Sequence, residues 1–206
     1  MKNYFITVAG NIAAGKTSLT DVLSKQFGWH PFYESADGNP YLSDFYNDMK
    51  KWAFHSQIYF LTQKVKAFYN IAKYNKSMIV DRTFYEDGEI FAKNLHITGL
   101  MNDNDYNTYM ELFKFLTEFL PKPDIMIYLR ANVDFLHNRI MQRSRVYELG
   151  VSKEYLNHLN TYYEDWIQNY KGSKLLIINA EDYDYLKNEK DLKAVIEQVQ
   201  KFINVQ

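Results

Sequence analysis

Residues 10 to 17 read Gly10-Asn11-Ile12-Ala13-Ala14-Gly15-Lys16-Thr17, a complete G-x-x-x-x-G-K-T motif. An apolar run at residues 4–9 precedes the motif, and residues 17–27 space their apolar side chains as an amphipathic helix does. In this setting glycine lets the backbone curl so that successive N–H groups converge on phosphate oxygens, and the following helix adds the positive end of its dipole. The motif therefore predicts a protein that binds nucleoside triphosphates.

Two side chains at the end of this loop are predicted to have different roles, one in binding phosphate and the other in binding Mg²⁺. Lys16 would reach the β- and γ-phosphates, and the Thr17 hydroxyl would be a ligand for Mg²⁺, which shares the phosphates with few protein oxygens. The residues expected to bind ATP are Gly10, Asn11, Ile12, Ala13, Ala14, Gly15, Lys16, Thr17 and Ser18.

The composition excludes several classes of protein. The chain has 206 residues, of which 47% are hydrophobic, so it can bury a full core, and we interpret residues 1–206 as a single domain. A net charge of −1 argues against binding to nucleic acid or to an anionic membrane through a broad positive field. The sequence contains no cysteine and no apolar run near the ~18 residues of a membrane span. We expect a cytoplasmic protein whose ligands are small molecules.

Alternating apolar runs and helical patterns predict the fold class. Strands are expected at residues 4–9, 77–80, 124–129 and 174–178, with a fifth near 31–33. Helices are expected at residues 17–27, 41–74, 84–94, 103–119, 132–142, 152–170 and 189–203. The alternation indicates an α/β fold, a five-stranded parallel sheet with helices on both faces.

Local signals set some of the helix ends, and two helices are unusually apolar. Asp103, Asn132 and Ser152 are expected N-caps, and Pro121 and Pro123 end the helix before the fourth strand. The segments at about 52–74 and 103–119 carry more aromatic and aliphatic side chains than one face needs. Those side chains fit either an ordinary core or the interface of a homodimer, and we predict a homodimer.

Charged residues follow two of the predicted strands. Glu34 comes after the second strand, and Asp81 and Arg82 come at the end of the third. Ligands of open α/β sheets gather at the carboxyl ends of strands, so Glu34 is either directed at the phosphates or simply exposed to solvent. Facing the phosphates, Glu34 could accept a proton from a substrate hydroxyl, and Arg82 could neutralise developing charge. Asp81, with Thr17 and Glu34, supplies oxygens for Mg²⁺.

Other nucleotide-binding and metal-binding classes are not favoured. The segment nearest to a guanine-recognition motif, Asn75-Lys76-Ser77-Met78, lacks the terminal aspartate that guanine requires. The five histidines are scattered without the spacing of a zinc or iron site. Four of the five arginines lie between residues 130 and 145, and clustered guanidinium groups suit phosphate oxygens.

Several segments together carry a family resemblance. They are the loop Gly10 to Thr17, Tyr33-Glu34, Asn39-Pro40-Tyr41-Leu42, residues 52–61 (WAFHSQIYFL), residues 81–88 (DRTFYEDG) and the arginine-rich segment from Arg139 to Glu148. With these motifs the chain resembles, over nearly its whole length, the deoxyribonucleoside kinases, and specifically their bacterial deoxyadenosine/deoxyguanosine kinase branch. The resemblance implies the P-loop kinase fold.

The resemblance also implies substrate contacts. Glu34 resembles the base that takes the 5′-hydroxyl proton, with Arg82 close to the same oxygen. Gln57 resembles a glutamine whose amide offers a donor and an acceptor to the nucleobase. Further base contacts are implied for Lys64 and Asp87. Contacts to the sugar 3′-hydroxyl are implied for a final pair of residues, Tyr46 and Glu148.

Residues 139–150 resemble the family's lid. Arg139 and Arg143 stand four apart and project from one helical face, and Arg145 follows where the helix ends. Closure over ATP would bring cations to the transferring phosphoryl group and exclude water. The resemblance implies that the catalytic residues are Glu34, Arg82, Lys16, Arg143 and Arg145, and that Arg139, Arg143, Asp182 and Tyr183 also contact ATP.

Two positions depart from the family pattern. Ala13-Ala14 replaces a Gly-Ser type pair in the loop, which fits if neither residue needs a positive φ angle. Lys64 stands where arginine is frequent, and lysine lacks the bidentate fork.

The sequence as a whole predicts an ATP-dependent, Mg²⁺-requiring kinase for the 5′-hydroxyl of purine deoxynucleosides. Deoxyadenosine is the favoured acceptor, followed by deoxyguanosine and then deoxycytidine. One alternative is a thymidylate-type nucleoside monophosphate kinase, which needs extra cations in its acceptor pocket. The other is a non-catalytic nucleotide-binding regulator, which would bind ATP without transferring phosphate.

Overall fold

The fold is built on a five-stranded parallel sheet. The structure, a computed structural model, describes residues 3–34, 38–71 and 74–204. The strands are β1 (Phe5–Gly10), β2 (His30–Phe32), β3 (Met78–Asp81), β4 (Ile125–Arg130) and β5 (Lys174–Asn179). Their order is β2-β3-β1-β4-β5, and every pair is parallel. The predicted α/β class and five-stranded parallel sheet are confirmed.

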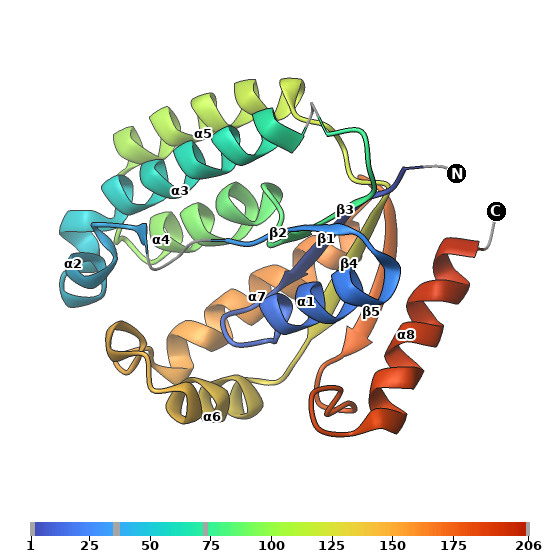
Figure 1. Cartoon of the computed structure of the whole chain (residues 1–206). Coiled ribbons are helices and arrows are strands. Elements are labelled where there is room, and N and C mark those ends of the chain that lie inside the picture. The colour runs from blue at the N-terminus through green and yellow to red at the C-terminus, as the bar shows by residue number, and fades with distance from the viewer. Residues whose placement is uncertain (1–2, 35–37, 72–73, 205–206) are drawn as a thin grey trace.

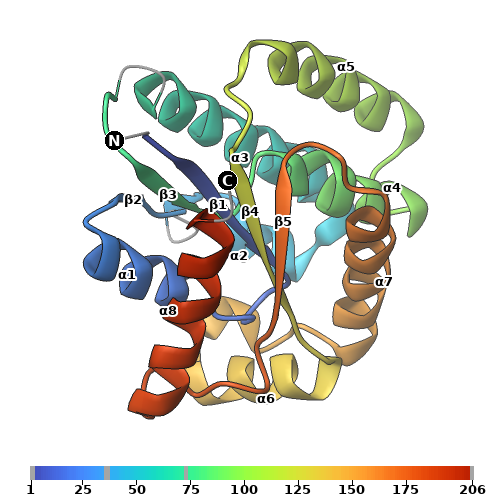
Figure 2. The same cartoon turned by 90° about the vertical axis from the view of Figure 1, so that its right-hand side faces the viewer.

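Helices cover both faces of the sheet (Figures 1 and 2). On one face lie α1 (Lys16–Phe27) and α8 (Glu189–Asn204). The remaining helical elements are α2 (Leu42–Asn47), α3 (Met49–Ile71), the π-helix η2 (Asp87–Ala92), α4 (Lys93–Ile97), α5 (Asp103–Phe119), α6 (Val133–Arg143), the 3-10 helix η3 (Val146–Glu148) and α7 (Lys153–Asn169). Right-handed crossovers from β2 to β3, from β3 to β4 and from β4 to β5 place α3, α4 and α7 on the opposite face.

The central strand β1 positions the phosphate loop. All six residues of β1 are buried, because it pairs with β3 on one side and β4 on the other. Leu19 and Leu23 of α1 are fully buried in the same core as Val195 and Val199 of α8. The sheet therefore holds the loop after β1 beside the carboxyl ends of β3 and β4.

Two predicted helices differ from the structure. The single helix expected at residues 41–74 is divided at Asp48, whose backbone leaves the helical region at φ −145° and ψ 81°. The Asp48 carboxylate accepts a hydrogen bond from the Lys51 N–H and so starts α3, and residues 72 and 73 lie outside the described part of the chain. The helix expected at 84–94 contains the π-helical η2 before it continues as α4.

The predicted N-caps are confirmed except at α5. Asn132 and Ser152 accept hydrogen bonds from the N–H groups of the third residues of α6 and α7. At α5 the cap is Asn102, whose Oδ1 accepts from the Asp105 N–H at 2.9 Å, and Asp103 instead pairs with His96. Since asparagine and aspartate cap helices equally well, the sequence did not separate these neighbours.

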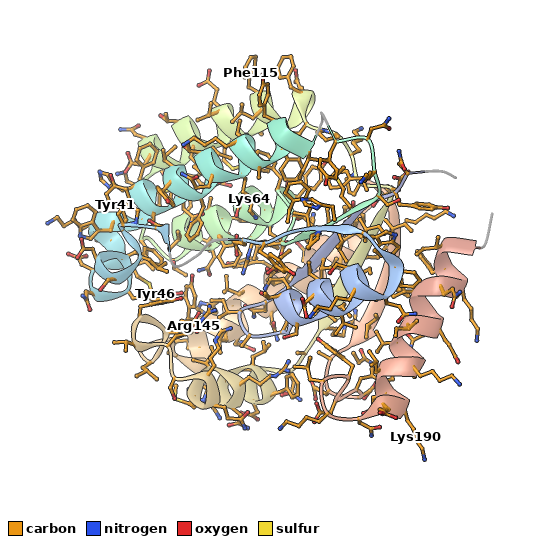
Figure 3. All side chains as sticks on the ribbon, viewed as in Figure 1. Tyr41, Tyr46, Lys64, Phe115, Arg145 and Lys190 are labelled. Carbon is orange, nitrogen blue, oxygen red and sulfur yellow. The ribbon has the colours of Figure 1, made fainter. Side chains whose placement is uncertain are left out.

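The apolar side chains of α3 and α5 fall into two groups. Phe68, Tyr109 and Phe113 belong to a buried cluster beneath the two helices. Leu112, Phe115 and Phe119 of α5 are exposed, and Phe115 projects from the molecule in Figure 3. Core packing therefore explains the first group, whereas the second group is exposed to solvent. No helix within the described residues is long and apolar enough to cross a membrane.

Candidate active site

The loop after β1 folds tightly against residues from distant parts of the chain. Gly15 adopts φ +105°, and a Cβ there would lie 2.7 Å from the Tyr185 hydroxyl and 3.0 Å from Arg139 Nη1. Ala13 has φ 65°, so the condition under which the Ala13-Ala14 pair fits the loop without strain is not met. The left-handed conformation costs an alanine about 1 kcal/mol, and the surrounding loop contacts hold it there.

Lys16 turns back over the loop. Its Nζ donates to the carbonyl oxygens of Gly10 at 2.8 Å and Asn11 at 2.9 Å. Burial, and secondly the positive charge of Arg82, lower the pKa of Lys16 to about 8. A buried ammonium has lost part of its hydration. The negative charge of a phosphate would compensate for that loss, so Lys16 is suited to bind an anion.

Thr17 and Asp81 meet at the ends of the loop and of β3. The Thr17 hydroxyl donates to Asp81 Oδ2, and burial is the main cause of the raised pKa of Asp81. Mg²⁺ bound to a triphosphate takes only one or two protein oxygens, so these two groups fit that ion. No group of three or more histidine, cysteine or acidic side chains suited to a metal occurs within the residues described.

Glu34 lies at the centre of a buried charge cluster. Its Oε2 accepts from Arg82 Nε at 2.6 Å, and its Oε1 lies 3.3 Å from Lys64 Nζ. Lys64 also pairs with Asp87 Oδ2 at 3.4 Å. Burial alone would raise the pKa of Glu34, but the positive charges of Arg82, Lys64 and Lys16 lower it to about 2. Glu34 is therefore ionised and held in a fixed orientation, with 15% of its side chain exposed.

Two buried oxygen atoms beside this cluster have no hydrogen-bond donor within the described part of the chain. They are Gln57 Oε1 and Asp87 Oδ2. Burial raises the pKa of Asp87 to about 6, although Lys64 opposes the shift. Lys64 Nζ lies 3.4 Å from Asp87 Oδ2 without forming a hydrogen bond, and both Gln57 and Asp87 line a cavity, so a ligand there could donate to these atoms.

The predicted sugar-binding pair, Tyr46 and Glu148, lines the same cavity as Gln57 and Asp87. Tyr46 is half-buried, and its ring lies parallel to that of Tyr147 at 6.3 Å. Burial raises the pKa of Tyr46, so its hydroxyl stays protonated. Glu148 accepts from Arg143 Nε at 2.6 Å and lies 3.7 Å from Arg145 Nη1. Arg143 and Arg145 of the predicted lid thus both contact Glu148, the carboxylate predicted to bind the sugar.

Two cavities meet at the loop, because some of the same side chains line both of them. Predicted site residues that line the first are Ile12, Ala13, Lys16, Thr17, Glu34, Tyr46, Gln57, Asp81, Arg82, Asp87, Arg143, Arg145 and Glu148. The second is lined by Ala13, Gly15, Lys16, Thr17, Ser18, Arg139, Gln142, Arg143 and Arg145. Lys64 is not among the described residues that line the first cavity, but it forms ion pairs with Glu34 and Asp87, which do line it.

Neither Asp182 nor Tyr183 lines these two cavities, and their contact with ATP stays a prediction. Asp182 Oδ2 accepts from Asn179 Nδ2 at 3.1 Å, and the Tyr183 hydroxyl accepts from Gln198 Nε2 at 2.7 Å. Tyr185, two residues further on, reaches the loop instead and donates to the Gly15 carbonyl oxygen at 3.1 Å. An irregular loop has no periodicity from which the inward-facing tyrosine could have been selected.

The sequence analysis also missed a buried pair behind the loop, Glu86 and Tyr163, both fully buried. The Tyr163 hydroxyl lies 2.7 Å from Glu86 Oε1 and 2.9 Å from the Gly10 carbonyl oxygen. Glu86 lies within a motif that carries the family resemblance, but nothing in its sequence setting pointed to the loop. Tyr163 lies on the apolar face of α7, where a tyrosine is expected to be simple core.

The fold and the paired cavities define a P-loop kinase that acts on a small molecule. The family described as deoxynucleoside kinase matches residues 6–204. A deoxyadenosine/deoxycytidine kinase of Bacillus subtilis (strain 168) is 40% identical over 205 residues, which are 98% of this chain and 94% of that protein. A deoxyguanosine kinase of Lactobacillus acidophilus is 36% identical over 203 residues, covering 94% of this chain and 88% of the relative.

Solved structures agree with these relatives. Deoxyadenosine kinase from M. mycoides with bound dATP superimposes with a TM-score of 0.84 at 31% identity, covering 96% of this chain and 100% of that one. The chain belongs to the deoxynucleoside kinase family, and the resemblance inferred from the sequence is confirmed.

Proposed function

We propose that this enzyme transfers the γ-phosphoryl group of ATP to the 5′-hydroxyl of a purine deoxynucleoside, with deoxyadenosine preferred over deoxyguanosine and deoxycytidine. One observation carries the proposal. The two cavities share Lys16, Thr17, Arg143 and Arg145, so a donor in one and an acceptor in the other would meet at the loop lysine. Phosphoryl transfer requires that in-line placement more than covalent help.

Glu34 is suited to the proton transfer. It is ionised at neutral pH and lies in the acceptor cavity together with Lys16. As the bond between the 5′-oxygen and the γ-phosphorus forms and the bond to the β,γ-bridging oxygen breaks to release ADP, the carboxylate would accept the hydroxyl proton. Arg82, 2.6 Å from Glu34, would stay beside the same oxygen and neutralise the charge that develops there.

The unsatisfied acceptors suit a nucleobase that carries hydrogen-bond donors. Gln57 Oε1 and Asp87 Oδ2 form no hydrogen bond within the described residues, and the exocyclic amino group of adenine could donate to them, as could those of guanine and cytosine. Lys64 presents a donor next to Asp87, which suits a ring nitrogen. The cations Lys64 and Arg82 already pair with Glu34 and Asp87, so this cavity suits an uncharged nucleoside better than a monophosphate.

Mg²⁺ would be held by Thr17 and Asp81, with Glu34 in the same cavity. When bound, the ion neutralises phosphate charge and orients the phosphates. Residues 139–150 would act as a lid, because Arg143 and Arg145 line both cavities. Release of Glu148 to the sugar would free both guanidinium groups for the transferring phosphoryl group.

We further propose that residues 1–206 form one kinase domain that works in the cytoplasm as a homodimer. The absence of cysteine suits a reducing compartment. The exposed apolar residues of α5, Leu112, Phe115 and Phe119, recur on one helical face and suit a two-fold contact with a second copy.

A coupled assay with ATP, Mg²⁺ and each of the four deoxynucleosides tests the reaction. We expect turnover with deoxyadenosine at the highest kcat/KM, and weaker competition from dAMP than from deoxyadenosine. Better competition by the monophosphate would favour the thymidylate-type alternative. ATP binding without any phosphorylated product would favour the regulator.

A further inference from the structure

A buried carboxylate ties together the backbones that form the site. Glu86 Oε1 accepts from the Gly10 N–H at 3.1 Å, and Oε2 accepts from the Thr83 N–H at 2.6 Å. The Tyr163 hydroxyl lies 2.7 Å from Oε1, so α7 joins the same cluster. The ends of β1 and β3 are therefore fixed to each other through one side chain, directly behind the phosphate loop.

The Tyr163 hydroxyl has two acceptors and only one proton. Glu86 Oε1 lies 2.7 Å away and the Gly10 carbonyl oxygen 2.9 Å away, so the hydroxyl can donate to one of them at a time. The Gly10 carbonyl also accepts from Lys16 Nζ at 2.8 Å. While Lys16 occupies this carbonyl, the phenol is free to donate to Glu86.

Binding of a triphosphate changes this balance. When the loop holds triphosphate as proposed, we expect Lys16 to turn from the loop carbonyls toward the phosphates, which withdraws a donor from the buried Gly10 oxygen. A buried carbonyl that loses its donor is unfavourable. The Asn11 carbonyl keeps the N–H of Ala14 at 3.1 Å, whereas the Gly10 carbonyl has the Tyr163 hydroxyl within reach.

We propose that Tyr163 is a positioning residue for the loop lysine: its hydroxyl donates to Glu86 when Lys16 binds Gly10, and to Gly10 when Lys16 engages phosphate. Arg82 Nη1, 3.8 Å from Glu86 Oε1, stays beside the carboxylate that the phenol leaves. This inference rests on the proposed use of the loop for triphosphate, and it adds a residue outside the cavities that sets the affinity for the phosphate donor.

Tyr163→Phe tests the proposal, with Tyr162→Phe as the matched control. Tyr162 is the adjacent tyrosine of α7, and its ring lies 5.3 Å from Lys93 Nζ. In Tyr163→Phe we expect the Kd of ATP to rise about fivefold to tenfold, the value of one hydrogen bond. The KM of the deoxynucleoside should stay within about twofold. The control should change neither quantity.

Each outcome decides a different point. Unchanged ATP affinity in folded Tyr163→Phe, or an equal loss of nucleoside affinity, would overturn the positioning role. Wild-type protein that does not bind ATP would instead overturn the proposed function. If Tyr163→Phe does not fold, a crystal structure of the wild type with a non-hydrolysable ATP analogue decides. We expect Lys16 Nζ on the phosphates and the Tyr163 hydroxyl on Gly10; Lys16 still bound to Gly10 would overturn the proposal.

Discussion

Arg82 donates from Nε to Glu34 Oε2 at 2.6 Å, although the Arg82 backbone lies in the left-handed region at φ 69°. A non-glycine residue in that region stores strain, which persists only where the surroundings fix it. Here the Arg82 N–H donates to the Val8 carbonyl, and the guanidinium lies 4.6 Å from the centre of the Phe91 ring. The pair is held in one geometry before any ligand arrives, which is what electrostatic catalysis requires.

Glu34→Gln should therefore lose turnover with little loss of binding. The amide cannot take the hydroxyl proton, and general-base catalysis contributes about 10²–10⁴-fold. We expect kcat to fall in that range while the Kd of deoxyadenosine changes only a few-fold. The exposed Glu154→Gln is the matched control for charge. Near wild-type kcat in folded Glu34→Gln would show that another group takes the proton.

The affinity for ATP should fall at alkaline pH. Lys16 has a pKa of about 8 in the free enzyme, so above that pH it is increasingly neutral and loses its attraction for phosphate. The Kd of ATP, measured by calorimetry, should rise toward tenfold per pH unit above about 8. Tyr185, the tyrosine on the loop, has a pKa of about 12 and stays neutral in this range. A flat profile from pH 7 to 9.5 would contradict the assignment.

The use of deoxyadenosine should weaken at acid pH. Asp87 has a pKa of about 6, so below it the carboxyl is protonated and no longer an effective acceptor for the adenine amino group. We expect kcat/KM for deoxyadenosine to fall as pH drops from 7 to 5. Asp87→Asn should remove this acidic limb and lower kcat/KM at pH 7. An unaltered limb in that variant would assign it to another group.

The free energy of unfolding should depend on pH because the pKa of Glu34 differs between the folded and unfolded states. Its pKa is about 2 in the folded protein and near 4.5 when unfolded, so its contribution is present above pH 4.5 and is lost as pH falls toward 2. We expect the difference in free energy of unfolding between wild type and Glu34→Gln to shrink over that window, as measured by urea unfolding. A constant difference would mean that the charge cluster does not lower this pKa.

The parts of the site that follow strands were predictable from the sequence. Lys16, Glu34 and Asp81 each come after an apolar run, and parallel strands bring such residues to one edge of the sheet. Such predictions succeed because pairing within the sheet fixes the positions of the strand ends. The same reasoning placed the five strands to within a residue or two.

Other features depend on packing between distant segments. Glu86 and Tyr163 are 77 residues apart, and each has an unremarkable setting in the sequence. The positive φ of Ala13 follows from how the loop closes. An alanine by itself favours a negative φ, so its side chain does not predict this conformation. The Tyr185 hydroxyl donates to the Gly15 carbonyl of the loop, whereas the Tyr183 hydroxyl accepts from Gln198 of α8. Single-sequence patterns carry no information on such contacts.

The exposed face of α5 provides the test of the homodimer. Phe115 and Phe119 are 58% and 70% exposed, and their rings lie 5.0 Å apart. They form an apolar pair on the surface of the single chain. Phe115→Glu would place a charge in a two-fold contact twice, once from each copy, so we expect a dimer to become a monomer in light scattering. Leu186→Glu is the control, because Leu186 is similarly exposed but lies in the loop before α8. A monomeric wild type, or a dimer that survives Phe115→Glu, would place this face outside the interface.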